Sequence, residues 1–384
     1  MTNILSILNN PKLRSAFYQV LLAATVIWLG YELAMNARAN LRAQTGLGFL
    51  NETAGFSVSQ SLIPYSESDT YGRVLLVGLL NTLLVSALGV LFATVIGVTI
   101  GVARLSSNWL VARLAGLYVE AIRNLPLLFQ ILFWYLAVLG MLPPPRQSLS
   151  ILGEVFLSNR GLIVPRPMLT EHGSWAFVAA GVGLAISIGV YVWARRLQRR
   201  TGRRFPAGLV GIAIVVALTG VSIVAFDAPV TFEHAQLKGF NFVGGLRVIP
   251  EFVALLVALA TYTAAFIAEI VRAGILTVSR GQMEAASALA LRRGAALRLI
   301  VLPQALRAII PPLTSQYLNL TKNSSLAYAI GYPDLVSVFA GTTLNQTGQA
   351  IEIIAITMGI YLALSLLTSA FMNWYNARVA LVER

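Results

Sequence analysis

Residues 279–303 read SRGQMEAASALALRRGAALRLIVLP and separate two strongly apolar segments of the chain. Ser279 and Gln282 have the spacing of a capping box, which predicts that a helix begins just after Ser279. The Arg-Arg-Gly sequence at 292–294 is expected to interrupt this helix, and Pro303 suits the first turn of the next one. The small side chains that would let a second molecule approach closely are Ala285, Ala286, Ala288 and Ala290. The stretch therefore predicts an amphipathic docking helix on a membrane surface; the alternative is an ordinary helical hairpin.

The composition indicates an integral membrane protein. Hydrophobic residues make up 57% of the chain, charged residues only 11%, and the mean hydropathy is +0.75. A membrane helix needs about 20 apolar residues, and the runs of that length are 17–35, 74–102, 122–142, 175–192, 207–226, 252–276, 305–329 and 351–372. The short alternating segments of a membrane barrel are absent from the sequence. We therefore expect an all-α integral membrane protein with about eight spans.

The distribution of charge predicts the orientation of these helices. The formal net charge is +13. If there are eight spans, the arginine-rich segments all lie on one side, which the positive-inside rule makes cytoplasmic. These arginines are Arg104, Arg113, Arg195, Arg196, Arg199, Arg200, Arg203, Arg204, Arg280, Arg292, Arg293, Arg298, Arg378 and Arg384. Both termini are then cytoplasmic, and the positive charge is explained by topology and the lipid bilayer, with no nucleic-acid partner.

The chain divides into four regions. Residues 1–72 contain the first span and an outward polar segment, and residues 73–142 form the first part of the helical core. Residues 143–249 look like an insertion of two spans with their loops, and residues 250–384 form the second part of the core. The inserted spans contain almost no polar residues, whereas a substrate path usually retains some. We expect the inserted pair to lie at the periphery.

Two pairs of opposite charge lie three residues apart, where they could pair on one helix face. Glu120 and Arg123 form the first pair, and Pro126 breaks the backbone shortly after them. Glu269 and Arg272 form the second pair, near the cytoplasmic end of their span. For this second pair, a structural role that steadies the helix is favoured over a gating role.

The segment 311–328 is the best candidate for a polar path through the membrane. Pro311 and Pro312 remove backbone hydrogen-bond donors. The polar side chains that we assign to the path are Gln316, Asn319, Lys322, Asn323, Ser324 and Ser325. An intramembrane lysine costs about 2.5–3.5 kcal/mol on insertion scales, so Lys322 should face protein or a wet cavity.

Metal and thiol chemistry find no support in the residues. The chain has no cysteine, so it has no thiolate ligand and no cysteine nucleophile. Its two histidines, His172 and His234, lie far apart in the sequence. We therefore expect no metal site.

Five motifs occur in the order found in polar-amino-acid ABC importer permeases, and the chain resembles that family. The motifs are G-L-x-N-T-L from Gly78, Glu120 to Leu127, Glu269 to Ile275, Glu284-Ala285-Ala286 with Val301-Leu302-Pro303, and Leu320 to Leu326. The matching blocks, 71–142 and 250–375, cover about half of the chain. With its Asn10-Pro11 lead and its insertion, the chain is most similar to the larger permease of a general L-amino-acid importer.

The resemblance implies a type I ABC-importer permease core with one extra N-terminal span and two inserted spans. It implies that the ATPase-docking loop contains Glu284, Ala285, Ala286, Ala290, Gly294 and Pro303. The family usually has glycine where this chain has Ala290. The Cβ of Ala290 either fits a slightly different docking groove or continues the helix for another turn.

The resemblance also implies partners in a bacterial inner membrane. They are a second permease, forming a heterodimer with this chain, an ATPase dimer, and a periplasmic amino-acid-binding protein. The three lysines, Lys12, Lys238 and Lys322, lie outside any G-K-[ST] phosphate loop. We therefore expect a transport subunit rather than an enzyme, with no cofactor of its own and with ATP used by the separate ATPase.

Two interpretations of Lys322 remain open. In the first, Lys322 attracts the α-carboxylate of an amino acid while Asn323 and the serines hydrogen-bond its polar groups. In the second, Lys322 forms a structural ion pair with Glu352, Glu269 or the partner permease. At the level of the whole protein, the alternatives are a secondary transporter or channel that needs no ATPase, and a polytopic membrane enzyme, which lacks a convincing catalytic set.

Overall fold

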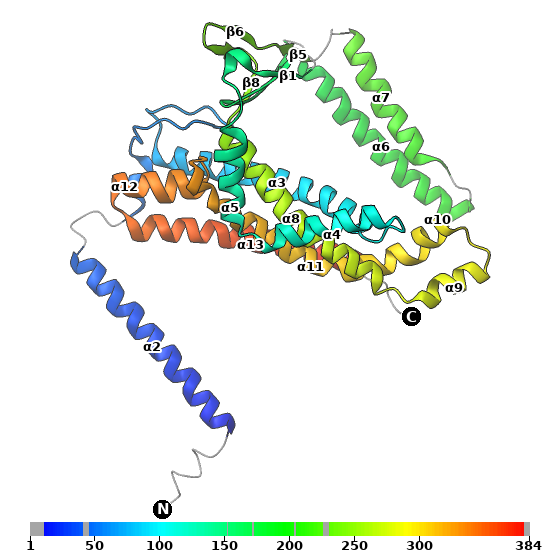
Figure 1. Cartoon of the computed structure of the whole chain (residues 1–384), viewed down its shortest axis with the longest axis horizontal. Helices are drawn as coiled ribbons and strands as arrows, with labels where there is room; N and C mark the ends of the chain where they lie inside the picture. Colours follow the sequence, from blue (N-terminus) through cyan, green and yellow to red (C-terminus); the bar gives the residue numbers. More distant parts are fainter. Residues whose placement is uncertain are drawn as a thin grey trace, which may run out of the picture.

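The computed structural model describes residues 11–40, 46–151, 153–170, 173–202, 205–225 and 230–379. The longer helices are α2 (Pro11–Asn40), α3 (Tyr71–Ala103), α4 (Trp109–Asn124), α5 (Leu127–Leu132), α6 (Gly173–Thr201), α7 (Ala207–Ala225), α8 (Pro250–Leu276), α9 (Arg280–Ala288), α11 (Leu302–Asn323) and α13 (Ala350–Val379). The short helices are η1 (Leu47–Asn51), η2 (Phe133–Leu139), η3 (Pro145–Gln147), α10 (Arg293–Ala296), η4 (Leu297–Val301), η5 (Ser324–Ile330), η6 (Val336–Thr343) and α12 (Leu344–Thr347). Figure 1 shows α3, α8, α11 and α13 side by side in one bundle.

The predicted helical membrane fold is confirmed, while the count of eight spans is not. Among the described residues, six helices are long and apolar enough to cross a membrane, or seven if one bent pair is counted as a span. The bent pair is α4 followed by α5 and η2, with 106° between its halves. The bend within the run 122–142 lies where Pro126 was expected to break the backbone. Leu125 is extended, at φ −98° and ψ 131°, because the residue before a proline is pushed out of the helical region.

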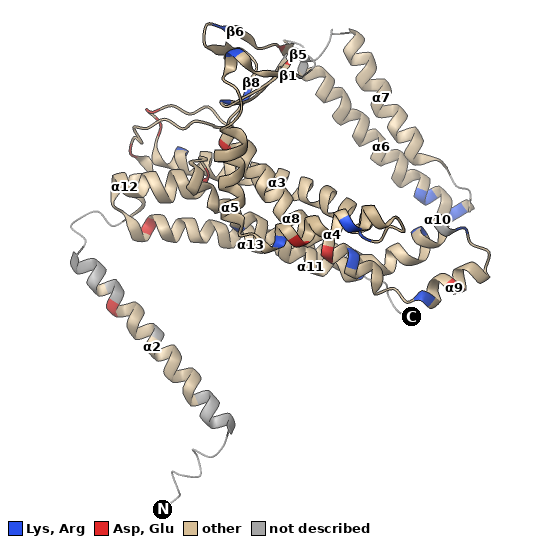
Figure 2. Cartoon of the chain, in the orientation of Figure 1, with Lys and Arg blue, Asp and Glu red and all other residues tan. Residues whose placement is uncertain are grey.

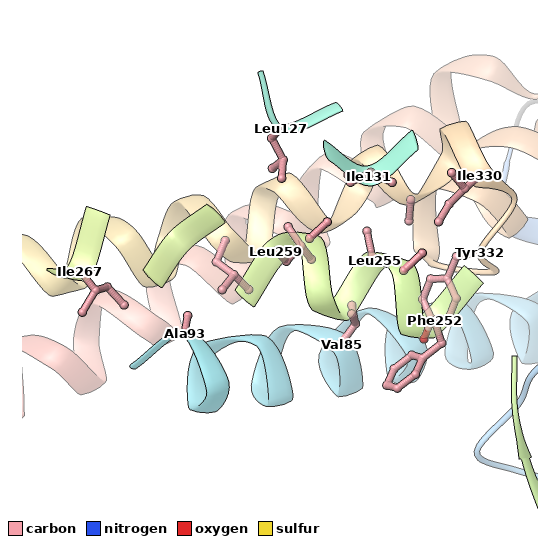
Figure 3. Close-up of a cluster of buried hydrophobic side chains, with 14 of the residues drawn as sticks. Val85, Ala93, Leu127, Ile131, Phe252, Leu255, Leu259, Ile267, Ile330 and Tyr332 are labelled. Atoms are coloured by element: carbon pink, nitrogen blue, oxygen red, sulfur yellow. The ribbon is translucent and has the colours of Figure 1, made fainter. Parts of the chain in front are cut away.

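The core of the fold is the contact between α3 and α8, which depends on glycine. A Cβ on Gly97 would lie 2.6 Å from the Cβ of Ile267, and one on Gly101 would lie 2.7 Å from the carbonyl oxygen of Ala268. Figure 3 shows α3 and α8 facing each other, with side chains such as Val85 and Leu255 between them. Small residues are needed here because helices in lipid gain their association energy from close packing.

Asn81 and Thr82, from the G-L-x-N-T-L motif, fix the chain that leads into η6. The amide of Asn81 donates hydrogen bonds to the carbonyl oxygens of Gln60, at 2.8 Å, and Pro333, at 2.9 Å. The hydroxyl of Thr82 accepts a hydrogen bond of 3.0 Å from the backbone N–H of Leu335. These bonds satisfy backbone groups in a buried segment that lies between two short helices, where no regular structure can do so.

The insertion forms a helical hairpin and a set of short strands that the sequence analysis missed. The strands are β1 (Leu149–Ile151), β2 (Val155–Ser158), β3 (Gly161–Val164), β4 (Arg166–Leu169), β5 (Val230–Glu233), β6 (Gln236–Lys238), β7 (Asn241–Val243) and β8 (Leu246–Val248). They pair in the orders β1-β2-β3-β8, β4-β5 and β6-β7. Helices α6 and α7 pack on each other and stand apart from the bundle in Figure 1. This matches the expected peripheral position of the inserted pair.

Gly97→Ala tests the glycine contact. The added methyl group would overlap Ile267, so we expect the free energy of unfolding to fall by about 1–3 kcal/mol. The measurement is an SDS titration of the purified subunit in mixed micelles. Gly359→Ala is the matched control, because a Cβ there meets nothing within 4 Å. Equal stability of the two variants would contradict the packing account.

Candidate functional site

The stretch 279–303 folds into three short helices, α9, α10 and η4, followed by the first two residues of α11. Helix α9 begins at Arg280, as the sequence predicted, with Ser279 at its N-cap. The side chain of Ser279 makes no capping hydrogen bond; instead its backbone carbonyl accepts one of 3.1 Å from the N–H of Gln282. After α9, α10 and η4 lead into α11, where Pro303 lies in the first turn. A break and a restart are present, but the predicted position of the break, 292–294, was wrong: α9 already ends at Ala288, and Arg293 and Gly294 belong to α10.

The small side chains of α9 do not all face outward, as we had expected. Glu284, Ala285 and Ala288 are exposed. Ala286 is only 1% exposed, because its methyl group lies inside the loop, where α9 packs against α10 and η4. Leu289, which we did not single out, is 75% exposed and extends the outward face. The exposed surface therefore consists of an acid, small residues and one large apolar side chain.

Ala290 ends α9 in the left-handed conformation, with φ 54°. The N–H of Ala290 donates to the carbonyl oxygen of Ser287 at 2.9 Å, and the N–H of Leu291 donates to that of Ala286 at 3.1 Å. This pair of bonds is the Schellman motif, whose left-handed residue is usually glycine. Of the two alternatives for Ala290, continuation of the helix is excluded, because the helix ends at Ala288. The glycine that the resemblance implies at this position would adopt this backbone conformation without a Cβ penalty.

The predicted pair of Glu269 and Arg272 is present and includes a third partner. A nitrogen of Arg272 lies 2.6 Å from an oxygen of Glu269. The other carboxylate oxygen of Glu269 pairs with Arg104, just beyond the end of α3. The carboxylate therefore ties the C-terminal end of α3 to α8, eleven residues before α9 begins. This geometry favours the structural role over gating.

The other predicted pair does not form. Among the described residues there is no ion pair between Glu120 and Arg123. The guanidinium of Arg123 lies over the ring of Phe266, 5.1 Å from its centroid. The physical reason is that an aromatic face of α8 is in reach, and a cation over a ring is a favourable contact. Pro126 does break the chain as expected, and α5 begins directly after it.

The polar residues of α11 divide into an open face and a buried face. Pro311, Pro312, Ser315, Asn319 and Lys322 are exposed in the single chain. Their spacing of three and four residues places them along one side of the helix. This side is free to meet another subunit or to line a path.

The remaining candidate path residues lie at the edge of this face or inside the fold. Gln316 and Asn323 are half-buried. Ser324 is fully buried, and its hydroxyl donates to the carbonyl oxygen of Thr321 at 2.7 Å. The hydroxyl of Ser325 likewise donates to the carbonyl oxygen of Lys322 at 2.7 Å. The two serines therefore satisfy the backbone where α11 gives way to η5.

Lys322 has no ion-pair partner among the described residues. Glu269 is occupied by two arginines, and a carboxylate oxygen of Glu352 accepts a hydrogen bond of 3.4 Å from the N–H of Gly46. Neither acid that we named within this chain is paired with the ammonium group. The ion-pair partners that remain for the ammonium group of Lys322 are a partner subunit and a ligand.

Residues 279–301 precede the start of α11, and Lys322 and Asn323 lie at its other end. Leu302 begins α11 and Asn323 ends it, so about 30 Å of helix separates them. This is about the thickness of the hydrocarbon core of a bilayer.

Gly294 is exposed between α9 and η4, with open space around its Cα. Among the described residues there is no group of three His, Cys, Asp or Glu that could hold a metal ion.

Comparison with known proteins gives three full-length relatives and a family. Residues 205–381 match the family of binding-protein-dependent transport system inner membrane components. The putative amino-acid ABC transporter permease protein YhdX of Escherichia coli is 50% identical, over 98% of this chain and 96% of that protein. The general L-amino acid transport system permease protein AapQ of Rhizobium johnstonii is 51% identical, over 99% and 95%. The glutamate/glutamine/aspartate/asparagine transport system permease protein BztB of Rhodobacter capsulatus is 41% identical, over 95% and 92%.

Ala290→Gly tests the end of α9. Removing the Cβ relieves a left-handed alanine, so we expect the loop to gain about 1 kcal/mol of stability. Hydrogen exchange measures this as about fivefold slower exchange at the N–H of Leu291, which the motif protects. Ala285→Gly, in the exposed helix interior, should have the opposite effect and cost about 1 kcal/mol. Slower exchange in Ala285→Gly, or faster exchange in Ala290→Gly, would contradict this geometry.

Proposed function

Because this chain belongs to the binding-protein-dependent permeases of amino-acid ABC transporters, we propose that it docks its ATPase through residues 280–303. The chain is the membrane permease subunit of an ATP-driven amino-acid importer and is not an enzyme. The observation that supports the docking site is the exposed face of α9, which consists of Glu284, Ala285, Ala288 and Leu289. The full-length relatives favour this function over a secondary transporter or channel.

The proposed assembly has four kinds of component. This chain pairs with a second, different permease, and an ATPase dimer binds on the cytoplasmic side and uses ATP. A periplasmic amino-acid-binding protein delivers the substrate from outside. The exposed polar side of α11 supports the pairing of two permeases, since a face with Asn319 and Lys322 is costly against lipid.

The proposed topology places both termini in the cytoplasm of a bacterial inner membrane. Arginines gather at the α9–α10 end of the bundle and at the tip of the α6–α7 hairpin, which lie toward the same side in Figure 2. The positive-inside rule assigns this side to the cytoplasm. The strands of the insertion then lie outside.

The proposed substrates are L-amino acids of several side-chain types, as in the importers that AapQ and BztB are named for. Lys322 would attract the α-carboxylate that all of them share, because its ammonium group is exposed on α11 without an acidic partner among the described residues. Gln316, Asn319 and Asn323 would hydrogen-bond polar groups along the same path. Ser324 and Ser325 contribute by holding the bend after α11.

Glu284→Lys and Ala285→Asp test the docking site. Each places an unmatched charge in the contact, so we expect substrate-stimulated ATP hydrolysis by the reconstituted complex to fall about tenfold or more, with the permease still inserted. Glu67→Lys, an exposed charge reversal in the outward segment, should leave hydrolysis unchanged. Hydrolysis at the wild-type level in both loop variants would remove residues 280–303 from the ATPase contact.

Lys322→Met tests the substrate path. Methionine keeps much of the side-chain length, so the complex should assemble while uptake of arginine, glutamate and leucine falls for all three. Asn323→Asp should instead favour arginine over glutamate, through a local charge effect of about 1 kcal/mol or more. The measurement is uptake into proteoliposomes, normalised to assembled complex. If Lys322→Met loses the complex instead, the lysine is a structural partner of the second permease. Unchanged uptake in both variants would exclude the segment from the path.

A further inference from the structure

The α6–α7 hairpin carries an open groove along its length. Leu184, Ile188 and Tyr191 line it from α6, and Gly208, Ile212 and Val216 line it from α7. The groove has a volume of about 380 Å³. From Leu184 to Tyr191 it follows about 10 Å of α6, which is long enough to hold part of an acyl chain.

Small residues create this groove. The helices touch at Gly211, where an added Cβ would lie 3.2 Å from the Cβ of Ser187. The hydroxyl of Ser187 is used within the hairpin, since it lies 2.8 Å from the carbonyl oxygens of both Gly183 and Gly211. At Gly208, by contrast, a Cβ would meet nothing within 4 Å. The groove is therefore apolar, and it is open beside Gly208, near the start of α7.

One end of the groove carries a cluster of positive charge. Arg195 follows Tyr191 by one turn, and its guanidinium lies over the Tyr191 ring, 5.1 Å from the centroid. Arg196 and Arg200 follow on the same helix and are exposed. None of the three pairs with a carboxylate among the described residues. Figure 2 shows this positive charge at the end of α6 that meets the loop to α7.

We propose that the groove binds one anionic phospholipid, with an acyl chain between α6 and α7 and the phosphate at Arg195, beside which Arg196 and Arg200 add positive charge. Basic clusters at the ends of membrane helices attract anionic headgroups, and guanidinium groups bind phosphate through paired hydrogen bonds. A phospholipid satisfies the apolar channel and the charge at its end together. A helix of a partner permease would fill the channel but would leave the arginines without anions.

The test is native mass spectrometry of the purified complex with phosphatidylglycerol or phosphatidylcholine of the same acyl chains. We expect phosphatidylglycerol to bind about tenfold more tightly. Arg195→Gln should remove most of this preference and keep the weaker binding of phosphatidylcholine. Gly208→Leu should fill the groove and reduce the binding of both lipids, with the complex still assembled because the new side chain meets open space.

Two matched controls separate this site from general lipid binding. Gly189→Leu adds the same side chain at an exposed position of α6 where a Cβ meets nothing within 4 Å, and Arg166→Gln removes a charge on β4. Both should bind lipid as the wild type does. Equal affinity for the two lipids, or unchanged binding in Gly208→Leu, would overturn the proposal. So would loss of permease pairing in Gly208→Leu, which would show that a protein helix occupies the groove.

Discussion

The close contact of α3 with α8 is the constraint on which the rest of the structure depends. Lipid tails are as apolar as leucine side chains, so these helices are held by packing rather than by exclusion of water. Gly97 and Gly101 allow the two backbones to approach, and the same contact brings Arg104 to Glu269. Because only three residues separate the end of α8 from the start of α9, the position of the proposed docking loop is set by this packing.

The helices of this transporter subunit are interrupted at three places. At Leu125, at Ala290 and after Ile330 the chain leaves the helix, and each break is stabilised locally. Pro126 causes the break at Leu125. Hydrogen bonds to the carbonyl oxygens of Ser287 and Ala286 stabilise the break at Ala290, and Gly331, at φ 72°, ends η5 after Ile330. Irregular backbone at membrane depth is tolerated where it is buried in protein or lines a cavity. The backbone at Pro333 and Leu335 is buried in protein in this way, and it is hydrogen-bonded by the side chains of Asn81 and Thr82.

The sequence predicted what local patterns determine. Hydrophobic run length identified the six helices that are long and apolar enough to span, although the count of eight is not confirmed, and the spacing of Glu269 and Arg272 identified their pair. The sequence did not reveal which side of α9 faces inward, because the burial of Ala286 depends on the packing of α9 against α10 and η4. The sequence also did not predict the short strands of the insertion. Strands of three or four residues give too few alternations to be recognised, and β3 pairs with β8, which is distant in the sequence.

The central claim is that the outward face of α9 touches an ATPase, and the absence of cysteine from the chain makes it directly testable. Leu289 is the most informative position, since it is large, apolar and 75% exposed on that face. The measurement is cross-linking in native membranes from a single cysteine in Leu289→Cys, with Phe240→Cys, exposed between β6 and β7 of the insertion, as the control. The account predicts an adduct of this chain with the ATPase subunit from residue 289 and none from residue 240. Cross-linking from residue 289 only to lipid or to the second permease, in a complex that still hydrolyses ATP, would contradict it.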